Sequence, residues 1–512
     1  MIEVLWWGAV LRLVQALLQA APTILIGLLI AGILRRLVGY EGTRRLFGHG
    51  SRRALFQAWL IGMLLPVCSL GVFPILRQLR LAGLSGGTLL AFALTAPLFN
   101  PISVLYGLTL SSPVVIITFC LCCLVIVSTI GLCWDRLYPG TAVASSEPAA
   151  TTYGIKRMLA VAVTAADDLV SSSSKFLWIG LIGAAALSVL LPMGYLQEAA
   201  EHDDPWAPLF MTLVATPAYT TPMAAMVQVA SMFEHGNSVG AAFALLTLGA
   251  GVNLGLIAWM IHVYGMRRTA VGFSLLWMLV VVLAYAVDKP LYPHGVNPPG
   301  HTHAFDAYCC PFPPSEPQAF QRMLTQLSEH SAPWETQALT MLVLLAVSGI
   351  FLKRTGGLQK LEAWFQQQPK TSSRYDIILP GPVLGAAALA GLIGFSVLGC
   401  YIYYPPPSEI FEEMRIINTE IVASANSRDW ETTAYWIPVQ EDWTRKLQVS
   451  MHLRGHSISP DQRDQTLQLL EALDLLEHAL DESSAEVIRD KARSVDQAYR
   501  GLRSAHRTTV SQ

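Results

Sequence analysis

The stretch Pro66-Val67-Cys68-Ser69-Leu70-Gly71-Val72-Phe73-Pro74 decides the fold of this chain. It lies inside an apolar segment, 54–76, and its prolines break the helix that the rest of the segment would form. Basic residues stand at both ends, Arg52-Arg53 before the segment and Arg77 and Arg80 after it. Because Lys and Arg concentrate in cytoplasmic loops, both ends are expected on the cytoplasmic side. A single crossing cannot satisfy this, so we predict a re-entrant hairpin, whose broken backbone must be buried in protein or line a cavity.

A second interrupted stretch is Thr216-Pro217-Ala218-Tyr219-Thr220-Thr221-Pro222, inside the apolar region 207–235. This region begins after an acidic loop that includes Asp203-Asp204 and ends at Glu234-His235. Both of its ends are therefore expected outside the membrane. Its two prolines break the helix in the same way. We predict a second re-entrant hairpin that enters from the opposite side.

The composition is that of a membrane protein. The 512 residues are 53% hydrophobic and only 14% charged, with a mean hydropathy of +0.44, whereas a soluble chain carries nearer a quarter charged residues. The first segment is too long for a cleavable signal peptide and ends at Arg35-Arg36, which predicts a cytoplasmic loop there and an external N-terminus. About 20 apolar residues span a bilayer. Ten segments qualify, and the loop charges turn them into eight crossings and two hairpins: 9–34, 54–76, 84–110, 113–134, 175–192, 207–233, 238–265, 269–287, 336–352 and 378–404.

The loop charges also predict the domain organisation of an all-α polytopic chain in the inner membrane. Acidic loops are placed outside and Arg- or Lys-rich loops inside. The expected parts are a first membrane half (1–135), a cytoplasmic linker (136–160), a second membrane half (161–290), an external loop (291–335), two additional transmembrane helices (336–404) and an extracytoplasmic four-helix domain (405–512).

The two halves share a spacing pattern. Two glycines four positions apart precede an asparagine by the same interval in each half, at Gly83, Gly87 and Asn100 and again at Gly236, Gly240 and Asn253. Each half holds three crossings, an odd number, so the halves are predicted to be inverted repeats. Helix-breaking segments in corresponding positions of inverted repeats point to a transport site near the bilayer midplane. The alternative is that the small residues only allow close helix packing, but two corresponding breaks favour transport.

The first half resembles the ArsP-type predicted-permease family. The resemblance rests on a Pro-x-Cys-Ser-x-Gly-x-x-Pro stretch, a basic turn ending in glycine, an Ala-Phe pair and a Pro-x-x-Asn-Pro motif, here 66–74, Arg80–Gly83, Ala91-Phe92 and Pro97–Pro101. It covers 1–290. It implies export of trivalent organoarsenicals, with the hairpin cysteine, Cys68, as a thiol ligand.

The chain departs from the family pattern at one thiol. The family often has Cys-Ser-Cys where this chain has Cys68-Ser69-Leu70, and the second hairpin has no cysteine. As(III) is soft and favours thiolates. Another metalloid, an anion or a neutral solute therefore stays open as the substrate, and helix N-termini at the hairpin tips would favour an anion.

The hairpins and their flanking helices supply the candidate site residues. Cys68 is either a soft ligand or a small residue that packs a tight hairpin. The asparagines either bind substrate or satisfy carbonyl groups freed by the breaks. The predicted substrate-binding residues are Cys68, Ser69, Asn100, Thr216, Thr220, Thr221 and Asn253. The predicted architectural residues are Pro66, Gly71, Pro74, Pro97, Pro101, Pro217 and Pro222.

Two other polar groups are candidates. His301, His303, Asp306 and Cys309 in the external loop have the ligand types of a zinc or copper site, but not the spacing of a known closed site; Cys309 and Cys310 would otherwise be oxidised outside the cytoplasm. Asp167 and Asp168 could form a proton relay, but nearby Lys156, Arg157 and four serines favour a cytoplasmic interfacial helix.

The sequence of the C-terminal part predicts a helical bundle. Its expected role is to recognise a protein partner or to gate the release of substrate. It lacks Cys-x-x-Cys-His, so covalent haem is excluded, and no cofactor is expected. Its histidines, His452, His456, His478 and His506, are interpreted as surface residues.

The chain has no P-loop and no basic excess that would indicate nucleic acid. The expected partners are a small-molecule or metalloid substrate and the lipid bilayer. The alternative function is a membrane-anchored metal-dependent enzyme or sensor, which no His-Glu-x-x-His motif supports.

Overall fold

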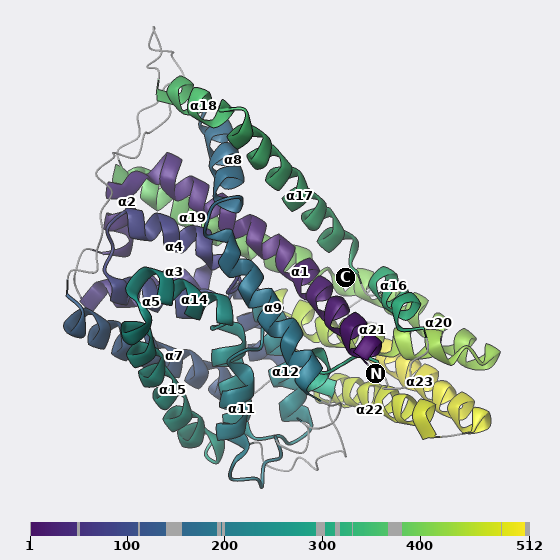
Figure 1. The fold of residues 1–512 in the computed structure, drawn as a ribbon. Helices are drawn as coiled ribbons and strands as arrows, with labels where there is room; N and C mark the ends of the chain where they lie inside the picture. Colours follow the sequence, from purple (N-terminus) through teal and green to yellow (C-terminus); the bar gives the residue numbers. More distant parts are fainter. Residues whose placement is uncertain are drawn as a thin grey trace. The chain divides into compact units, whose positions relative to one another are not determined.

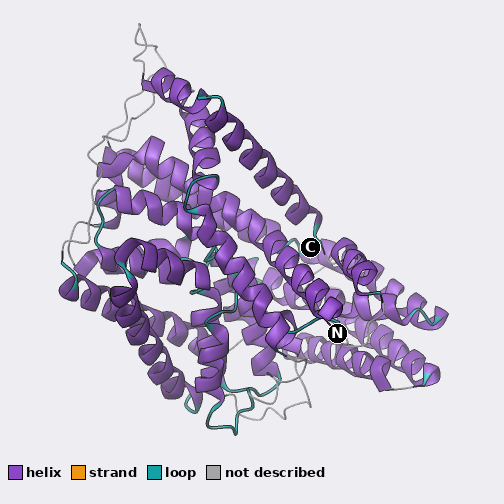
Figure 2. Ribbon diagram, in the orientation of Figure 1, coloured by secondary structure: helices purple, strands orange, loops and turns teal. Residues whose placement is uncertain are grey.

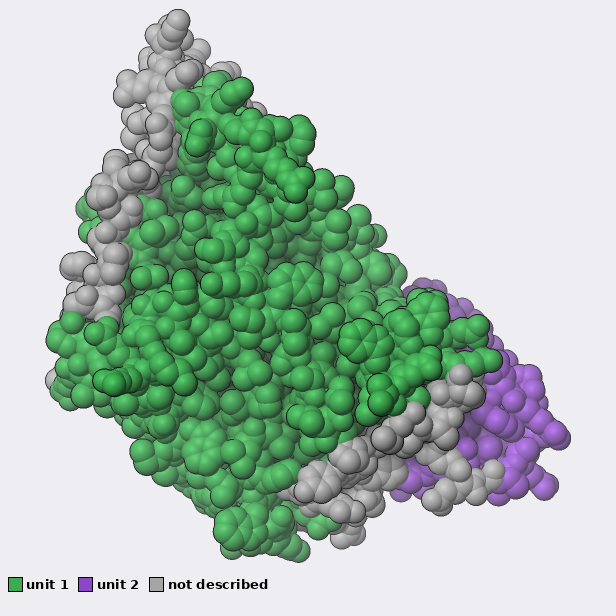
Figure 3. All heavy atoms as spheres, viewed as in Figure 1, with its two compact units in different colours: residues 1–104, 114–396 green, residues 105–113, 397–512 purple. Residues whose placement is uncertain are grey.

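A computed structural model describes most of the chain, and the described residues are helical (Figure 2), with no β-strand among them. This confirms the prediction of an all-α chain. Contacts divide the chain into two compact units, Met1–Val104 with Val114–Ser396 and Leu105–Pro113 with Val397–Gln512 (Figure 3). The described residues are 2–48, 52–110, 113–139, 156–191, 196, 200–292, 303–312, 318–329, 331–366, 381–482 and 484–506.

The first part of the chain runs from a long N-terminal helix to a long apolar one. Its helices are α1 (Ile2–Ile33), the π-helix η1 (Leu34–Val38), α2 (Gly39–Phe47), α3 (Arg52–Leu64), α4 (Val72–Leu81), α5 (Gly86–Thr95), α6 (Pro101–Leu110) and α7 (Pro113–Leu137). The predicted first hairpin corresponds to α3, the connection 65–71 and α4, a pair for which the name hairpin is kept.

The next part of the chain ends, like the first, in a long apolar helix. Its helices are α8 (Lys156–Leu169), α9 (Ser174–Leu190), α11 (Ala207–Ala215), α12 (Pro222–Glu234), α13 (Val239–Ala244), the π-helix η2 (Leu245–Ala250), α14 (Leu254–Tyr264) and α15 (Met266–Asp288). After these come the 3-10 helix η3 (His303–Tyr308), α16 (Ala319–Glu329), α17 (Pro333–Arg354), α18 (Gly357–Gln366) and α19 (Gly381–Tyr403). Helix α1 packs along α8, α9 and α17 (Figure 1).

Several helices can cross a membrane. Within the described residues, Ile2–Phe47, α7, α15 and α17 are long and apolar enough, and the bent pairs α8–α9 and α13/η2–α14 raise the number to six. This agrees with the predicted polytopic class, and the count of eight crossings stays a prediction. Each bent pair turns by 56° at its break.

Two of the expected continuous spans are broken. Segment 84–110 stops at Thr95 and restarts at Pro101, and segment 238–265 stops at Ala250 and restarts at Leu254. Pro97 and Pro101 explain the first break because proline has no backbone N–H to donate. Each half therefore interrupts its helices twice, at the hairpin and again after it.

The predicted loop at Arg35-Arg36 is wrong, because α1 continues through η1 into α2. Arg36 is only 2% exposed. Its Nε donates to Thr164 Oγ1 (2.7 Å), and its guanidinium pairs with Glu362. A buried charge is tolerated when it is paired and hydrogen-bonded, so a basic pair beside an apolar run can stay helical.

One contact pattern, a capped helix start tied to an aspartate, occurs in both halves. In the first half, Ser85 caps α5, its Oγ donates to Asp135 (2.7 Å), and Gly87 N donates to the other oxygen of that carboxylate (2.8 Å). The pairs are separated by 50 and 48 residues. We call this arrangement the aspartate clamp.

The second aspartate clamp has the same spacing. Ser238 caps α13 and donates to Asp288 Oδ1 (2.6 Å), and Gly240 N donates to the same oxygen (2.8 Å). These pairs are again separated by 50 and 48 residues. Gly83 (φ 79°) and Gly236 (φ 64°) precede the two clamps in the left-handed region, where glycine ends a helix without strain. The glycine spacing seen in the sequence thus corresponds to the same kind of turn between two helices in both halves.

The C-terminal helices surround a core of their own. They are α20 (Pro407–Ser427), α21 (Trp430–Leu453), α22 (Pro460–Glu482) and α23 (Ala485–Ala505). Each contributes buried apolar side chains to it, among them Met414, Leu447, Leu473 and Val495. The surface interpretation of His506 is wrong: it is 2% exposed, and burial lowers its pKa. It follows the last apolar residue of α23, Leu502, by one helical turn, and so lies on the buried face.

Candidate functional site

The tip of the first hairpin is built around Cys68, which is fully buried. Its Sγ lies 2.9 Å from Thr23 Oγ1 on α1, and Gly71 N donates to it at 3.4 Å. The thiol therefore takes the position of a capping side chain for the first turn before α4. Gly71 brings this turn against the α1 backbone, because a Cβ there would lie 2.5 Å from Thr23 O.

The tip of the second hairpin has an oxygen in the corresponding place. Thr221 caps α12, and its Oγ1 accepts from Ala224 N at 3.3 Å. Thr221 precedes Asn253 by the same interval as Cys68 precedes Asn100. By this capping geometry Thr221 corresponds to Cys68, so the two halves place a hydroxyl and a thiol in one structural role.

The two hairpin tips meet. The phenol of Tyr219, in the second tip, faces the thiol of Cys68, in the first, but its hydroxyl makes no hydrogen bond to a described residue. Thr220 N donates to Gly249 O in η2 (3.2 Å). A Cβ at Gly180 in α9 would lie 2.8 Å from Leu70 Cδ2. The two hairpin tips, η2 and α9 therefore come together in one buried region.

The helix breaks that follow the hairpins, between Thr95 and Pro101 and between Ala250 and Leu254, lie in the same buried region. A Cβ at Gly251, in the second break, would lie 3.2 Å from Leu98 Cδ2, in the first. Asn253 Oδ1 lies beside Gly180, where the Leu70 side chain also ends. The hairpin tips and helix breaks of both halves therefore form one cluster, which we call the tip cluster: 66–71, 96–100, 217–221 and 251–253.

The predicted asparagines cap helices. Asn100 Oδ1 accepts from Ser103 N (2.7 Å) at the start of α6, and Asn253 Oδ1 accepts from Leu256 N (2.9 Å) at the start of α14. The side-chain oxygens thus satisfy N–H groups, whereas carbonyl groups had been expected as their partners. Caps are local, which is why the same interval recurs in both halves.

Some buried polar groups in the tip cluster have no hydrogen-bond partner within the described part of the chain. They are Ser69 Oγ, Tyr219 Oη and Asn253 Nδ2. Buried polar groups are usually hydrogen-bonded, since an unmade bond costs on the order of 1–3 kcal/mol. A ligand or water that accepts hydrogen bonds would satisfy all three. Tyr219 was not predicted, and only its meeting with Cys68 in space identifies it.

The other predicted residues lie at the ends of helices. Thr216 Oγ1 donates to Thr212 O of its own helix (3.0 Å), and Thr220 Oγ1 to Thr221 O (3.4 Å). Pro66 follows α3 and Pro217 follows α11, whereas Pro101 and Pro222 begin α6 and α12. Pro74 is in the first turn of α4, and Pro97 is in the first break. Proline at a helix start sacrifices no hydrogen bond.

The predicted metal site cannot be assembled from what the structure describes. His301 and the side chains of His303 and Asp306 lie outside the described residues. No group of three metal-ligating side chains occurs among those described. Cys309 is 1% exposed, and its carbonyl oxygen accepts from Arg12 Nε (3.1 Å).

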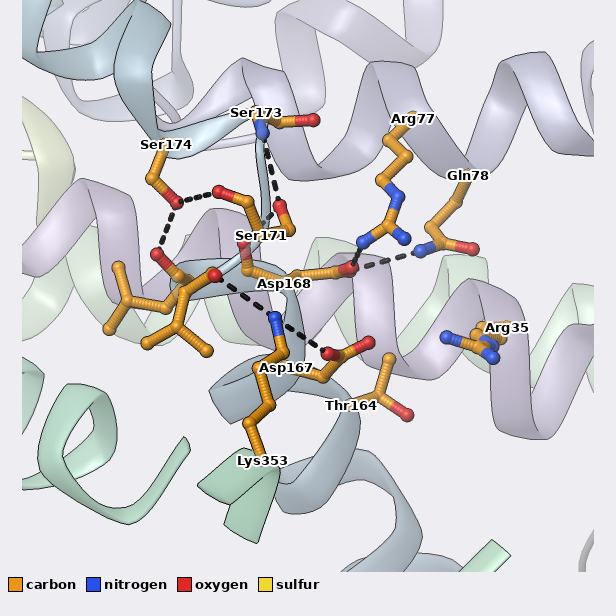
Figure 4. A network of polar contacts seen from close by, with 12 residues as sticks. Arg35, Arg77, Gln78, Thr164, Asp167, Asp168, Ser171, Ser173, Ser174 and Lys353 are labelled. Atoms are coloured by element: carbon orange, nitrogen blue, oxygen red, sulfur yellow. Dashed lines mark hydrogen bonds and ion pairs between the residues drawn. The ribbon is translucent and has the colours of Figure 1, made fainter. Parts of the chain in front are cut away.

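A polar cluster lies between the first hairpin and the α8–α9 break (Figure 4). Asp168, in the helix predicted to lie at the membrane interface, is only 4% exposed. Its carboxylate pairs with Arg77 and accepts from Gln78 Nε2 (2.9 Å), which compensates for its burial. Asp167 pairs instead with Lys353 (3.2 Å). The charges around Asp168 hid this burial from sequence reasoning, because they resemble those of a helix at a membrane surface.

A small cavity connects this polar cluster to the first hairpin. Its volume is about 20 Å³, enough for one water molecule. Arg77, Asp168 and Ser171 line it together with Leu70 and Ile24. Leu70 belongs to the tip cluster, so the cavity borders both clusters.

Comparison with known proteins fits this arrangement. The family described as "Predicted permease" (ArsP_1) matches residues 6–289, more than half of the chain. The UPF0718 protein YcgR of Bacillus subtilis (strain 168) is 38% identical over 89 residues, which cover 17% of this chain and 30% of that protein. No solved structure matches the chain. With its apolar spanning helices, the match identifies a multi-pass membrane transporter, and the chain belongs to the ArsP_1 family of predicted permeases.

Proposed function

We propose that the chain carries a small, uncharged solute with a soft centre through the tip cluster, and that trivalent organoarsenicals or a related metalloid are the substrates of an efflux reaction. The observation that carries this proposal is the meeting of Cys68 and Tyr219 from two equivalent hairpins. Broken helices that converge inside a membrane protein are typical of transport sites.

The chemistry of the tip cluster supports an uncharged substrate. One thiol, Cys68, stands beside unpaired donors on Ser69, Tyr219 and Asn253. A trivalent organoarsenical dihydroxide has a soft arsenic for the thiol and oxygens that accept hydrogen bonds. The segments of the tip cluster contain no Asp, Glu, Lys or Arg, so a permanently charged solute would find no counter-ion in them. An oxyanion, drawn by the starts of α4 and α12, is the alternative.

We further propose that the two halves are inverted repeats. The two aspartate clamps, the caps at Asn100 and Asn253, and the equivalence of Cys68 and Thr221 support this. Loop charges support opposite orientations of the halves. Our proposal also includes a location in the inner membrane, with an extracytoplasmic domain at 405–512 available to a protein partner, and the loop charges support this orientation.

The role of Cys68 is tested by two substitutions. Cys68→Ser keeps a capping atom of the kind that Thr221 supplies, so the folded amount should stay near wild type. Cys68→Ala loses the cap, which costs about 1 kcal/mol. In a bacterial host that lacks arsenical export, wild type should lower intracellular arsenic during exposure to a trivalent phenylarsenical. Cys68→Ser should raise it to the level of the empty host, because oxygen is a hard ligand.

Cys133→Ser is the matched control, since Cys133 lies on α7, outside the tip cluster, and should behave as wild type. An unchanged arsenic content in cells that express the wild-type chain would refute arsenical efflux. Wild-type activity in Cys68→Ser would refute a thiol ligand at the tip.

A further inference from the structure

The segment 303–312 follows the part of the chain that matches the permease family. It contains η3 and packs against α9 and α12. Its aromatic side chains face inward: Phe305 is 1% exposed, Tyr308 4% and Phe312 3%. A connecting segment on a surface normally buries little, so this one is docked onto the membrane unit as part of its structure.

Tyr308 reaches the second hairpin. Its hydroxyl donates to Gln228 Oε1 on α12 at 2.8 Å and also faces the side chain of Thr220. Thr220 belongs to the tip cluster and lies next to Tyr219, which faces Cys68. The segment thus delivers a phenolic hydroxyl to the edge of the proposed transport site.

The same segment is held on its other side by α1. Arg12 Nε donates to Cys309 O at 3.1 Å. A Cβ at Gly8 would lie 2.9 Å from Cys310 Sγ, so α1 and the segment are in close contact there. Helix α1 also carries Thr23, which contacts Cys68. The segment therefore contacts both α1, whose Thr23 contacts the first hairpin tip, and α12, which begins at the second tip.

We propose that segment 303–312 is the outer cover of the transport site, that Tyr308 belongs to that site, and that the cover must separate from α1 for solute to pass. This rests on the proposed function. Hydrogen bonds through Tyr308 and Arg12 and the packing of Phe312 against α1 hold the cover closed, and these are the contacts that opening has to break. The segment contacts the tip cluster through Tyr308, which faces Thr220.

A disulfide tests the movement. In Gly8→Cys the new Cβ would lie 2.9 Å from Cys310 Sγ, about the separation that a disulfide requires between one Cβ and the far sulfur. Purified Gly8→Cys in proteoliposomes should form the bond under oxidant. Flux of a trivalent phenylarsenical should then fall at least tenfold, and a reductant should restore it. Gly8→Cys with Cys310→Ser should not respond to oxidant.

The outcomes separate the two proposals. Absence of wild-type flux would count against the transport function itself. Wild-type flux together with undiminished flux in the cross-linked protein would overturn the cover. Failure of the disulfide to form in folded protein would also overturn it, because the contact with α1 would then be absent.

Tyr308→Phe gives a second readout. Loss of the hydroxyl should raise the KM for the phenylarsenical several-fold while kcat changes little, because the group contributes to the site. A change in the yield of folded protein with an unaltered KM would show that Tyr308 only packs the segment.

Discussion

Replacing Gly71 by alanine is expected to abolish transport and to deplete the folded protein. A Cβ at this position would lie 2.5 Å from Thr23 O, and a Cβ at Gly27 would lie 2.0 Å from Gly71 O. Both obstacles are backbone atoms, so no side-chain rotation relieves them. The hairpin or α1 has to shift. Overpacking of this kind costs about 1–3 kcal/mol, or more where the backbone has to yield.

The shift would also displace Cys68, which contacts both Thr23 and Gly71. The loss of transport should therefore exceed the loss of folded protein. Size-exclusion chromatography in detergent measures the second, and vesicle flux measures the first. Gly391→Ala is the matched control, because a Cβ on Gly391 meets nothing within 4 Å and alanine favours a helix. A Gly71→Ala variant with wild-type thermal stability would contradict the close contact between the backbones of Gly71 and α1.

The second large effect is expected at the aspartate clamps. Asp288→Ala removes the acceptor for Ser238 Oγ and Gly240 N, and leaves both donors buried. Hydrogen bonds to a charged group contribute about 1.5–3 kcal/mol each. The melting temperature of the purified protein should therefore fall by several degrees. Asp288→Asn keeps one acceptor oxygen and should lie between the alanine variant and wild type.

The first clamp gives the comparison within the same molecule. Asp135→Ala should destabilise in the same direction, but less, because Asp135 is only half-buried whereas Asp288 is 7% exposed. Asp135→Asn should again restore part of the lost stability. Thermal unfolding of the four variants is the measurement. If either aspartate is silent, the two halves do not share this interaction, and the repeat loses its main structural support.

Local features of the fold could be predicted from the sequence. The helix break between α3 and α4 follows from the Pro- and Gly-containing stretch there, because such residues act on the helix within a few positions. The recurrence of Gly83 and Asn100 as Gly236 and Asn253 follows from helix ends and caps, which are also local. The aspartates of the clamps carried the same signal, because each ends an apolar segment at the same interval after its glycine.

Contacts between distant segments could not be predicted. Nothing in the sequence indicates that Tyr219 would face Cys68, or that Asp168 would be buried against Arg77. Loop charges indicate the side of the membrane and say nothing about burial, and for this reason the burial of Arg36 and Asp168 was not predicted. The ligand types in the loop 291–335 predicted a metal site, whereas its aromatic residues, which have no ligand pattern, are the ones that dock.

The most direct test of the account is the flux of a trivalent phenylarsenical into proteoliposomes that contain purified Tyr219→Phe. The hydroxyl it removes is buried without a partner in the described structure, so thermal stability should be unchanged or slightly higher. Tyr264→Phe is the control, because Tyr264 Oη is also buried without a described partner but lies at the far end of α14 from Asn253. We expect wild type and Tyr264→Phe to transport equally and Tyr219→Phe to lose at least tenfold in flux. Equal flux in all three proteins, or none in wild type, would contradict a transport site where the hairpin tips meet.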